Sequence, residues 1–337
     1  MADKKYDVLT IGRSSIDLYS QDIGSPFNEI KGFDAFVGGS PLNIAVGCAR
    51  LGVNASLLTG VGNDKVGEFI VNFLNQEGVN THCIDIKAQS RSSAVVLGIE
   101  PPDKFPLVYY RDNAADSQIS IDDVIKAKVE EYNILLVNGT ALNIEPSRSA
   151  TFFAAEVAKK NNIDVVLDLD FRADQWHDYR AFGLMVRALL PKVKIAIGTE
   201  EEILAATMNS ASQVVIRDQQ ISAPEITGDI DSSIERLLSS GIEILIVKRG
   251  EKGASIHRTD GSHENVPGFP VEVLNVLGAG DAFASGFLYG ILQGWDLYKA
   301  CRMGNASGAH VVTKKGCANF MPTLKESMDF INANGGF

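Results

Sequence analysis

Hydrophobic and polar positions along the chain follow two alternating patterns. Short, continuous apolar runs of the kind that form buried strands are separated by longer stretches with helical periodicity. Buried strands that alternate with helices predict an α/β fold, in which a doubly wound and mainly parallel sheet is flanked by helices on both faces. The strand-like runs are Tyr6–Ile11, Ala55–Val61, Ile134–Val137, Val165–Asp168, Lys194–Ile197 and Ile242–Val247. Helical patterns include Leu42–Arg50, Val66–Gln76, Ser147–Lys160, Ile234–Leu238 and Ala282–Leu292.

Two segments break this alternation. Ile16–Val37 and Ser92–Tyr110, the second with a turn at 100–103, have the pattern of extended chain without a partner helix. Taken alone, they are compatible with ordinary surface loops. The chain shows no internal repeat, low-complexity tract or long linker, so we predict a single domain over residues 1–337.

Composition limits the class of protein. A chain of 337 residues with 45% hydrophobic and 22% charged residues is typical of a globular enzyme. The net charge of −11 argues against nucleic acid or an acidic membrane as a partner, although a local anion site remains compatible with it. There is no signal-peptide pattern and no apolar run long enough to span a bilayer, so we expect a cytoplasmic protein. The cysteines lack CxxC spacing, which predicts reduced thiols; they are Cys48, Cys83, Cys301 and Cys317.

The strongest chemical signal is Gly278-Ala279-Gly280-Asp281, which precedes an apolar, helix-like run. Small residues before a helix expose successive backbone N–H groups at the positive end of the helix dipole, which favours anion binding. An acid at that entrance suits removal of a proton beside the anion, and the alternative is a tight loop with a first-turn aspartate. Neither the P-loop pattern nor G-x-G-x-x-G is present, so the common rival nucleotide folds are disfavoured.

A second motif lies near the N-terminus. Gly38-Gly39-Ser40-Pro41-Leu42-Asn43 combines two glycines with Pro41, which suits the first turn of a helix. With both motifs in this order, the sequence resembles the ribokinase-like (phosphofructokinase B) family of carbohydrate kinases over nearly its whole length. The resemblance implies ATP and Mg²⁺ as cofactors. It also implies that segments at about 13–37 and 91–112 form a small β-sheet, which lies as a lid over the sugar and pairs two subunits in a homodimer.

The resemblance also implies the catalytic and sugar-binding residues. Asp281 would accept the proton of the attacking hydroxyl, and backbone N–H groups would hold the developing negative charge. Those N–H groups belong to Gly278, Ala279, Gly280 and Asp281. The sugar would be held by Asp17, Gly38, Gly39 and Asn43.

The nucleotide side is implied by weaker matches. Glu202 corresponds to the family's glutamate that organises magnesium through water, although Thr199 replaces the usual asparagine of that motif. A glutamate run that opens a helix is otherwise a stabilising first turn. Asn275 replaces the aspartate that often helps to hold potassium, which argues against potassium activation. The residues implied to contact ATP are Lys248, Gly250, Gly253 and Asn305.

Two arginines suggest the substrate class. The guanidinium group suits a carboxylate, and Arg111 and Arg172 follow candidate site strands, although solvated or ion-paired arginines remain the alternative. These segments resemble the acid-sugar kinases of the family. The resemblance implies phosphorylation of the terminal 6-hydroxyl of 5-dehydro-2-deoxygluconate in myo-inositol catabolism. The alternative substrates are 2-dehydro-3-deoxygluconate, which ranks second, and fructose or ribose, which rank third. The alternative from a different class is a non-catalytic ligand sensor, which loss of Asp281 would favour.

Overall fold

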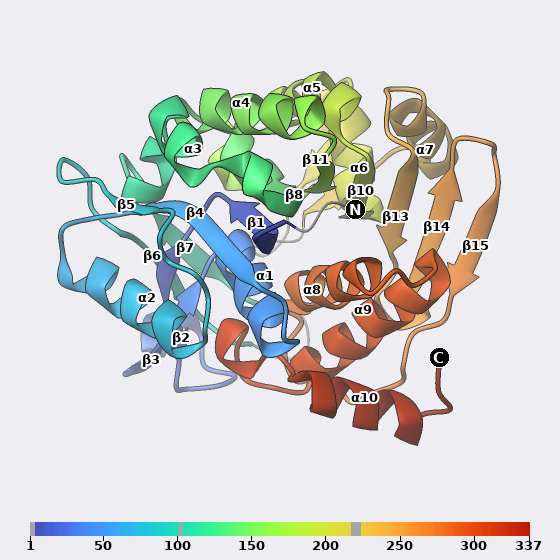
Figure 1. Cartoon of the computed structure of the whole chain (residues 1–337). Coiled ribbons are helices and arrows are strands. Elements are labelled where there is room, and N and C mark those ends of the chain that lie inside the picture. The colour runs from blue at the N-terminus through green and yellow to red at the C-terminus, as the bar shows by residue number, and fades with distance from the viewer. Residues whose placement is uncertain (1–3, 101–103, 217–223) are drawn as a thin grey trace.

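A computed structural model describes residues 4–100, 104–216 and 224–337. Its core is a nine-stranded sheet with the order β15-β14-β13-β10-β9-β8-β1-β4-β5 (Figure 1). From β5 to β13 in this order, all neighbouring strands pair in parallel, and only the β13–β14 and β14–β15 pairs at one edge are antiparallel, so the predicted α/β sheet is confirmed. The strands are β1 (Tyr6–Ile11), β4 (Ala55–Val61), β5 (Ile84–Ile86), β8 (Tyr132–Asn138), β9 (Asp164–Asp168), β10 (Ile195–Thr199), β13 (Ile244–Lys248), β14 (Ala254–Arg258) and β15 (His263–Val266).

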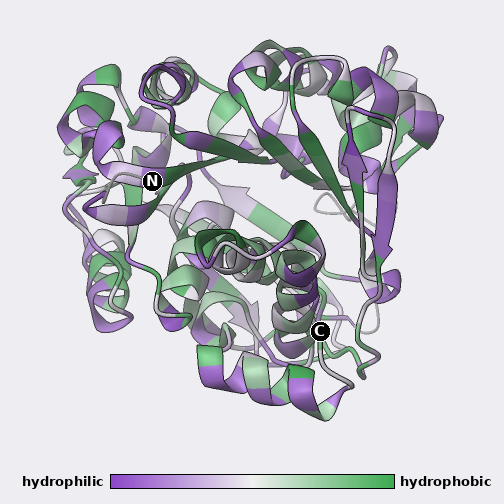
Figure 2. Cartoon of the chain, turned by 45° about the vertical axis from the view of Figure 1, so that its right-hand side comes forward, coloured by the Kyte–Doolittle hydropathy of each residue, from purple (hydrophilic) through white to green (hydrophobic). Residues whose placement is uncertain are grey.

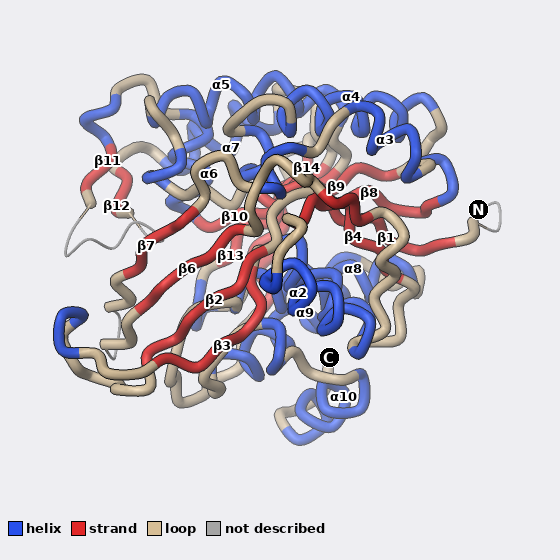
Figure 3. Tube along the Cα trace, turned by 90° about the vertical axis from the view of Figure 1, so that its left-hand side faces the viewer, coloured by secondary structure: helices blue, strands red, loops and turns tan. Residues whose placement is uncertain are grey.

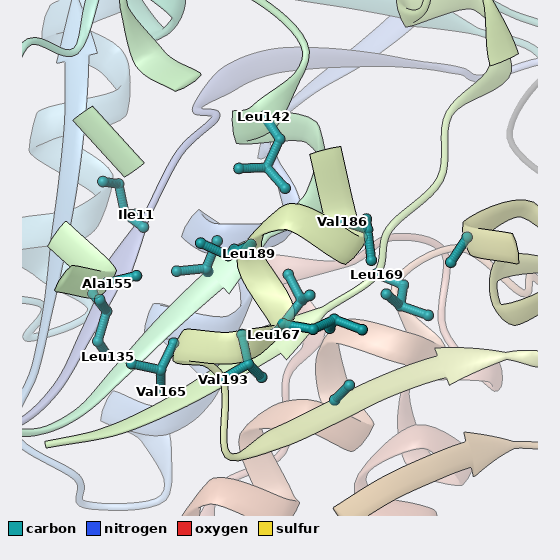
Figure 4. Packing of buried hydrophobic residues seen from close by; sticks show 14 of the residues in the cluster. Ile11, Leu135, Leu142, Ala155, Val165, Leu167, Leu169, Val186, Leu189 and Val193 are labelled. Atoms are coloured by element: carbon teal, nitrogen blue, oxygen red, sulfur yellow. The ribbon is translucent and has the colours of Figure 1, made fainter. Parts of the chain in front are cut away.

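Helices cover both faces of this sheet, because its central strands are apolar on both sides. On β8, Leu135 and Val137 pack against one layer of helices, whereas Ile134 and Leu136 pack against the other. Figure 4 shows Leu135 within the first cluster, near Ala155 and Leu189, and Figure 2 shows the largely hydrophobic strands with helices on both sides. The first layer is α3 (Ile121–Ala127), α4 (Ser147–Lys160), α5 (Tyr179–Leu189), α6 (Glu200–Thr207) and α7 (Ile230–Leu238). The second contains α1 (Ser40–Arg50), α8 (Ala279–Leu292) and α9 (Leu297–Val312), with α2 (Lys65–Gln76) packed beside α1 and α10 (Leu324–Ala333) beside α9.

The two segments that break the alternation form a separate sheet. Its order is β3-β2-β6-β7, and β2 pairs in parallel with β6 while the outer pairs are antiparallel (Figure 3). We call this sheet the lid, which consists of β2 (Ser15–Ser20), β3 (Phe33–Gly38), β6 (Ser93–Leu97) and β7 (Leu107–Tyr110). The predicted extended segments are therefore strands, and most of the predicted turn at 100–103 lies outside the described residues. A two-stranded ribbon of β11 (Val214–Val215) and β12 (Glu225–Ile226) completes the strands.

The topology fixes where a ligand can bind. Strand order reverses at β1, from which the chain runs to β4 on one side and later returns to β8 on the other. In open parallel sheets, ligands bind outside the carboxyl ends of the strands at this reversal. All four cysteines are free and buried, and no helix among the described residues is long and apolar enough to cross a membrane.

Candidate active site

Two adjoining cavities lie at the carboxyl ends of the sheet strands. The lid cavity, under the lid, is lined by residues that include Arg13, Asp17 and Asn43. The phosphate cavity, beside β9, β10 and β13, is lined by residues that include Lys248 and Gly280. Both cavities share four lining residues, so groups bound in the two cavities would meet there: Arg172, Leu277, Gly278 and Asp281.

Asp281 lies in the first turn of α8 and is held by the start of α1. Ser40 Oγ donates to Asp281 Oδ1 at 2.6 Å, and Asn43 Nδ2 donates to Oδ2 at 2.7 Å. Burial raises the pKa of Asp281 and the charge of Asp170 adds to the shift, while the two hydrogen bonds oppose it. Each carboxylate oxygen keeps a lone pair for a further donor. The carboxylate is therefore oriented and able to accept a proton.

The N-terminus of α8 presents free amides to both cavities. Gly278 has a φ of 82°, and its amide and those of Gly280 and Asp281 donate to no described residue. Ala279 differs from the prediction, because its N–H donates to the Val276 carbonyl at 3.3 Å and it lines neither cavity. Three of the four predicted amides thus remain available for an anion.

Lys248 provides a positive charge beside the N-terminus of α8. Its Nζ lies 3.1 Å from Asp168 Oδ1 and 3.6 Å from Glu202 Oε2. A Cβ built on Gly280 would lie only 3.0 Å from the same Nζ, so glycine lets the lysine approach the amides. Burial tends to lower the pKa of Lys248, but the two carboxylates outweigh it and raise the pKa overall. The lysine therefore carries a positive charge beside the free amide of Gly280.

A buried hydrogen-bonded chain connects the two cavities, and sequence reasoning did not identify it. Asn138 Nδ2, at the end of β8, donates to Ser40 Oγ at 2.8 Å and to Asp168 Oδ2 at 3.4 Å. Because Nδ2 can only donate, the Ser40 hydroxyl proton is directed toward Asp281. Burial raises the pKa of Asp168 to about 7, although Lys248 opposes the shift. Polar residues directly after buried strands were the available signal for Asn138 and Asp168.

Asp17 faces the lid cavity from β2. The predicted glycines Gly38 and Gly39 lie next to it, and Gly38 leaves the space that its carboxylate occupies. Ser15 Oγ donates to Asp17 Oδ1 at 2.6 Å, and burial raises the pKa of Asp17 while Arg13 opposes the shift. A Cβ on Gly38 would overlap the Asp17 carboxylate, so Gly38 makes room for a side chain and not, as predicted, for a ligand. Gly39, with a φ of 106°, lines the cavity and passes close to the Arg13 carbonyl.

The two predicted arginines occupy different places. Arg172 lines both cavities and forms an ion pair with Asp170 at 2.7 Å. Arg111 was predicted beside the sugar, but it lines neither cavity. Its Nη2 lies 2.6 Å from the fully buried Asp116, and its Nη1 donates to Gln175 at 2.7 Å. Arg111 therefore compensates a buried carboxylate, while Arg13, to which the sequence analysis gave no role, lines the lid cavity.

Three of the predicted nucleotide contacts lie outside the phosphate cavity. A Cβ on Gly253 would overlap the backbone of Val266, so this glycine permits packing between protein segments. Asn305 Nδ2 donates to the carbonyls of Val266 and Pro267 at 3.2 and 2.9 Å, which ties α9 to the same segment. A Cβ on Gly250 would meet no atom within 4 Å, and this glycine also lines neither cavity. Of the predicted ATP contacts, only Lys248 lines the phosphate cavity.

The metal-related predictions concern Glu202 and Asn275. Glu202 lines the phosphate cavity, and its carboxylate also accepts the Thr199 N–H at 2.8 Å in a capping box that starts α6. Within the described ranges, no three histidine, cysteine or acidic side chains gather into a metal site. The Glu202 carboxylate at this cavity is a ligand type that Mg²⁺ accepts, directly or through water. Asn275 Oδ1 accepts the Leu277 N–H at 2.9 Å and its Nδ2 donates to the Lys315 carbonyl at 3.3 Å, so both ends of this amide are engaged within the protein.

The fold and site together define a class of protein. A parallel α/β sheet carries a helix N-terminus with free amides, a lysine and an oriented carboxylate between two cavities, which is the equipment for phosphoryl transfer to a hydroxyl. The pfkB family carbohydrate kinase model matches residues 5–324. The chain therefore belongs to the pfkB family, and it is an ATP-dependent carbohydrate kinase.

Relatives and solved structures agree with this assignment. The 5-dehydro-2-deoxygluconokinase of Clostridium perfringens is 34% identical over 97% of this chain and 93% of that protein. The enzyme of the same name from Geobacillus thermodenitrificans is 32% identical over 97% and 94%, respectively. Fructokinase from Xylella fastidiosa with bound ATP superposes with a TM-score of 0.82 at 23% identity, covering 97% of this chain and 98% of that one. A sugar kinase from Pyrococcus horikoshii in complex with ATP gives 0.77 at 26%, covering 96% and 99%.

Proposed function

We propose that this kinase phosphorylates the terminal 6-hydroxyl of 5-dehydro-2-deoxygluconate in myo-inositol catabolism, in the cytoplasm. The observation that carries the proposal is the position of Asp281, a carboxylate held by Ser40 and Asn43 on the wall shared by both cavities. The choice among sugars is supported by curated relatives of that name at 32% to 34% identity over nearly the whole chain.

The proposed mechanism assigns the substrate to the lid cavity and the nucleotide phosphates to the phosphate cavity. Asp17 accepts sugar hydroxyl groups, and so does Asn43 Oδ1, a buried atom without a partner among the described residues. Asp281 accepts the proton of the attacking hydroxyl, and the free amides of Gly278 and Gly280 stabilise the transferred group.

The same assignment places charges around the nucleotide phosphates. Lys248 provides a fixed positive charge beside the free amides. Glu202 would hold Mg²⁺ through water, and the bound ion would neutralise phosphate charge. A potassium requirement is not part of the proposal, because both ends of the Asn275 amide are engaged.

The proposal is tested by ADP release with ATP and Mg²⁺ on four sugars. We expect kcat/KM for 5-dehydro-2-deoxygluconate to exceed the values for 2-dehydro-3-deoxygluconate, fructose and ribose. A preference for another of the four would reject the substrate and keep the mechanism. Absence of turnover on all four, with ATP still bound, would favour the ligand sensor.

We further propose that the lid pairs two subunits in a homodimer. The lid's outer face is apolar and in register across its strands: Leu18 lies beside Val96, which lies beside Val108, and no helix covers this face in Figure 3. Val108 is 44% exposed and Tyr110 62% exposed. A contiguous apolar patch of this kind marks an interaction surface.

The dimer makes a prediction for a single charge placed on that face. Val108→Glu should halve the mass measured by light scattering at micromolar concentration, because a buried carboxylate without a partner is costly. Leu184→Glu on α5, where the leucine is 57% exposed, is the matched control and should leave the mass unchanged. A wild-type protein that is monomeric at every concentration tested would refute the lid dimer.

A further inference from the structure

The Arg13 guanidinium is a buried charge inside the lid cavity. The residue follows β1 and is only 8% exposed. Its Nη1 donates to Ser15 Oγ at 3.1 Å, and its guanidinium carbon lies 5.1 Å from the centre of the Tyr109 ring. Among the described residues, no carboxylate forms a direct ion pair with it: Asp17 is bridged to it by the Ser15 hydroxyl, and the charges of Asp17 and Asp170 act on its pKa only from a longer distance. Most of its N–H donors are thus left for a ligand.

The other two arginines near the site have carboxylate partners. Arg111 is paired with Asp116 at 2.6 Å, and Arg172 is paired with Asp170 at 2.7 Å. An arginine stays charged in a protein, and a buried charge is costly unless it is paired. Of the arginines near this cavity, Arg13 is therefore the one that lacks a carboxylate partner, and an anionic ligand would supply the missing negative charge.

The form of the anion follows from the shape of the group. Five N–H donors in a planar fork match the two oxygens of a carboxylate, and such pairs are short and strong. Tyr109 supports one side of the guanidinium through a cation–π contact, which restricts the orientation of the fork. Arg13 lines only the lid cavity, whereas Asp281 lies on the wall that the lid cavity shares with the phosphate cavity. A sugar acid has its carboxylate at one end of the chain and its terminal hydroxyl at the other, which fits these two positions.

We propose that Arg13 is the residue that binds the substrate carboxylate and so selects sugar acids over neutral sugars. The proposal rests on the proposed function, because it assigns a role within the same substrate site. It transfers to Arg13 the recognition that the sequence analysis gave to Arg111. Arg172, already paired with Asp170, then serves at the boundary between the sugar and the phosphates.

The central test is the kinetics of Arg13→Gln. We expect KM for 5-dehydro-2-deoxygluconate to rise by roughly 10²-fold, the scale for a buried charge pair that loses one partner. KM for ATP should be unchanged, because Arg13 does not line the phosphate cavity. Arg13→Lys should recover only part of the loss, since lysine keeps the charge without the fork. Arg111→Lys, outside both cavities, is the matched control and should keep the wild-type KM for the sugar.

A second measurement on the wild-type protein covers the case in which the variant does not fold, because Arg13 also contacts Ser15 and Tyr109. D-gluconate and D-glucitol have the same six-carbon chain and differ in the carboxylate. Calorimetry without ATP should show D-gluconate binding at least tenfold more tightly. Equal binding of the two, or an Arg13→Gln variant that keeps the wild-type KM, would overturn the proposal.

These measurements separate the two proposals. If wild-type enzyme prefers 2-dehydro-3-deoxygluconate, the proposed substrate fails and the Arg13 proposal stands, since that sugar carries the same carboxylate. If the enzyme prefers fructose and binds D-gluconate no better than D-glucitol, both fail. Tight binding of inorganic phosphate in place of D-gluconate, lost in Arg13→Gln, would identify a phosphate subsite and overturn the carboxylate assignment.

Discussion

Asp281→Asn should lower turnover by roughly 10²- to 10⁴-fold, the usual contribution of a general base. Asparagine keeps the size of the side chain and an oxygen that can accept the Ser40 hydroxyl, but its amide cannot take the substrate proton. ATP affinity should change little, because Lys248 and the free amides of the phosphate cavity are untouched. The measurement is ADP release under saturating substrates, together with calorimetric binding of ATP.

The same residue sets the pH dependence. Since burial raises the pKa of Asp281 and Asp170 adds to the shift, the base becomes protonated at a higher pH than an ordinary aspartate. Turnover should therefore fall as the pH decreases through this raised pKa, and Asp281→Asn should remove the part of the dependence that comes from Asp281 and leave any part that comes from the buried Asp168. The raised pKa also means that the charged carboxylate is less favourable in the folded protein than in the unfolded one at neutral pH, so removing the charge should not cost stability by itself.

The control is an aspartate that only starts a helix. Asp296 caps α9 and accepts the Lys299 N–H at 2.8 Å. Asp296→Asn should retain wild-type turnover, with a small loss in melting temperature at most. If Asp281→Asn behaved in the same way, with normal turnover and lower stability, Asp281 would be a first-turn residue and the mechanism would be wrong.

The fold was predictable because its signals are local. Strand β4 and helix α4 coincide with the predicted Ala55–Val61 and Ser147–Lys160, since an apolar run and a helical period are each readable within one segment. Asp281 was identifiable for the same reason, because the small residues that expose an anion site precede it directly. The pairing of the lid strands required knowledge of the family, since β2 and β6 are separated by more than seventy residues.

The parts of the site that were misassigned depend on contacts between distant segments. Arg111 and Arg13 both have the chemistry of a carboxylate ligand, and only the folded chain shows that Asp116 pairs with Arg111. Likewise, Gly38 and Gly253 satisfy steric needs of Asp17 and of the Val266 backbone, which no local pattern reveals. The residue types predicted the chemistry correctly, whereas tertiary contacts determined which residue of each type faces the cavities.

Gly278→Ala should lower turnover by roughly 10²- to 10³-fold, the scale for losing a backbone donor to a developing negative charge. Gly278 has a φ of 82°, a conformation that costs an alanine on the order of 1–2 kcal/mol. Its added Cβ would also lie 2.5 Å from Cys317 Sγ and 2.9 Å from Cys317 Cβ, so the loop must move. Because Gly278 leads directly into the first turn of α8, which carries the free amides of Gly280 and Asp281, the displacement should remove anion stabilisation and not merely weaken folding.

The matched control for Gly278 is at the other end of the same helix. Gly294 follows α8 with a φ of 71° and has no neighbouring atom within 4 Å of an added Cβ. Gly294→Ala should therefore lose comparable stability from backbone strain alone and keep its turnover. Adding Cys317→Ala to Gly278→Ala removes the closest contact but leaves the Cβ contact and the strain, so it should restore part of the activity. Equal losses of turnover in Gly278→Ala and Gly294→Ala would show that the defect is general destabilisation, and the anion site at the start of α8 would have to be abandoned.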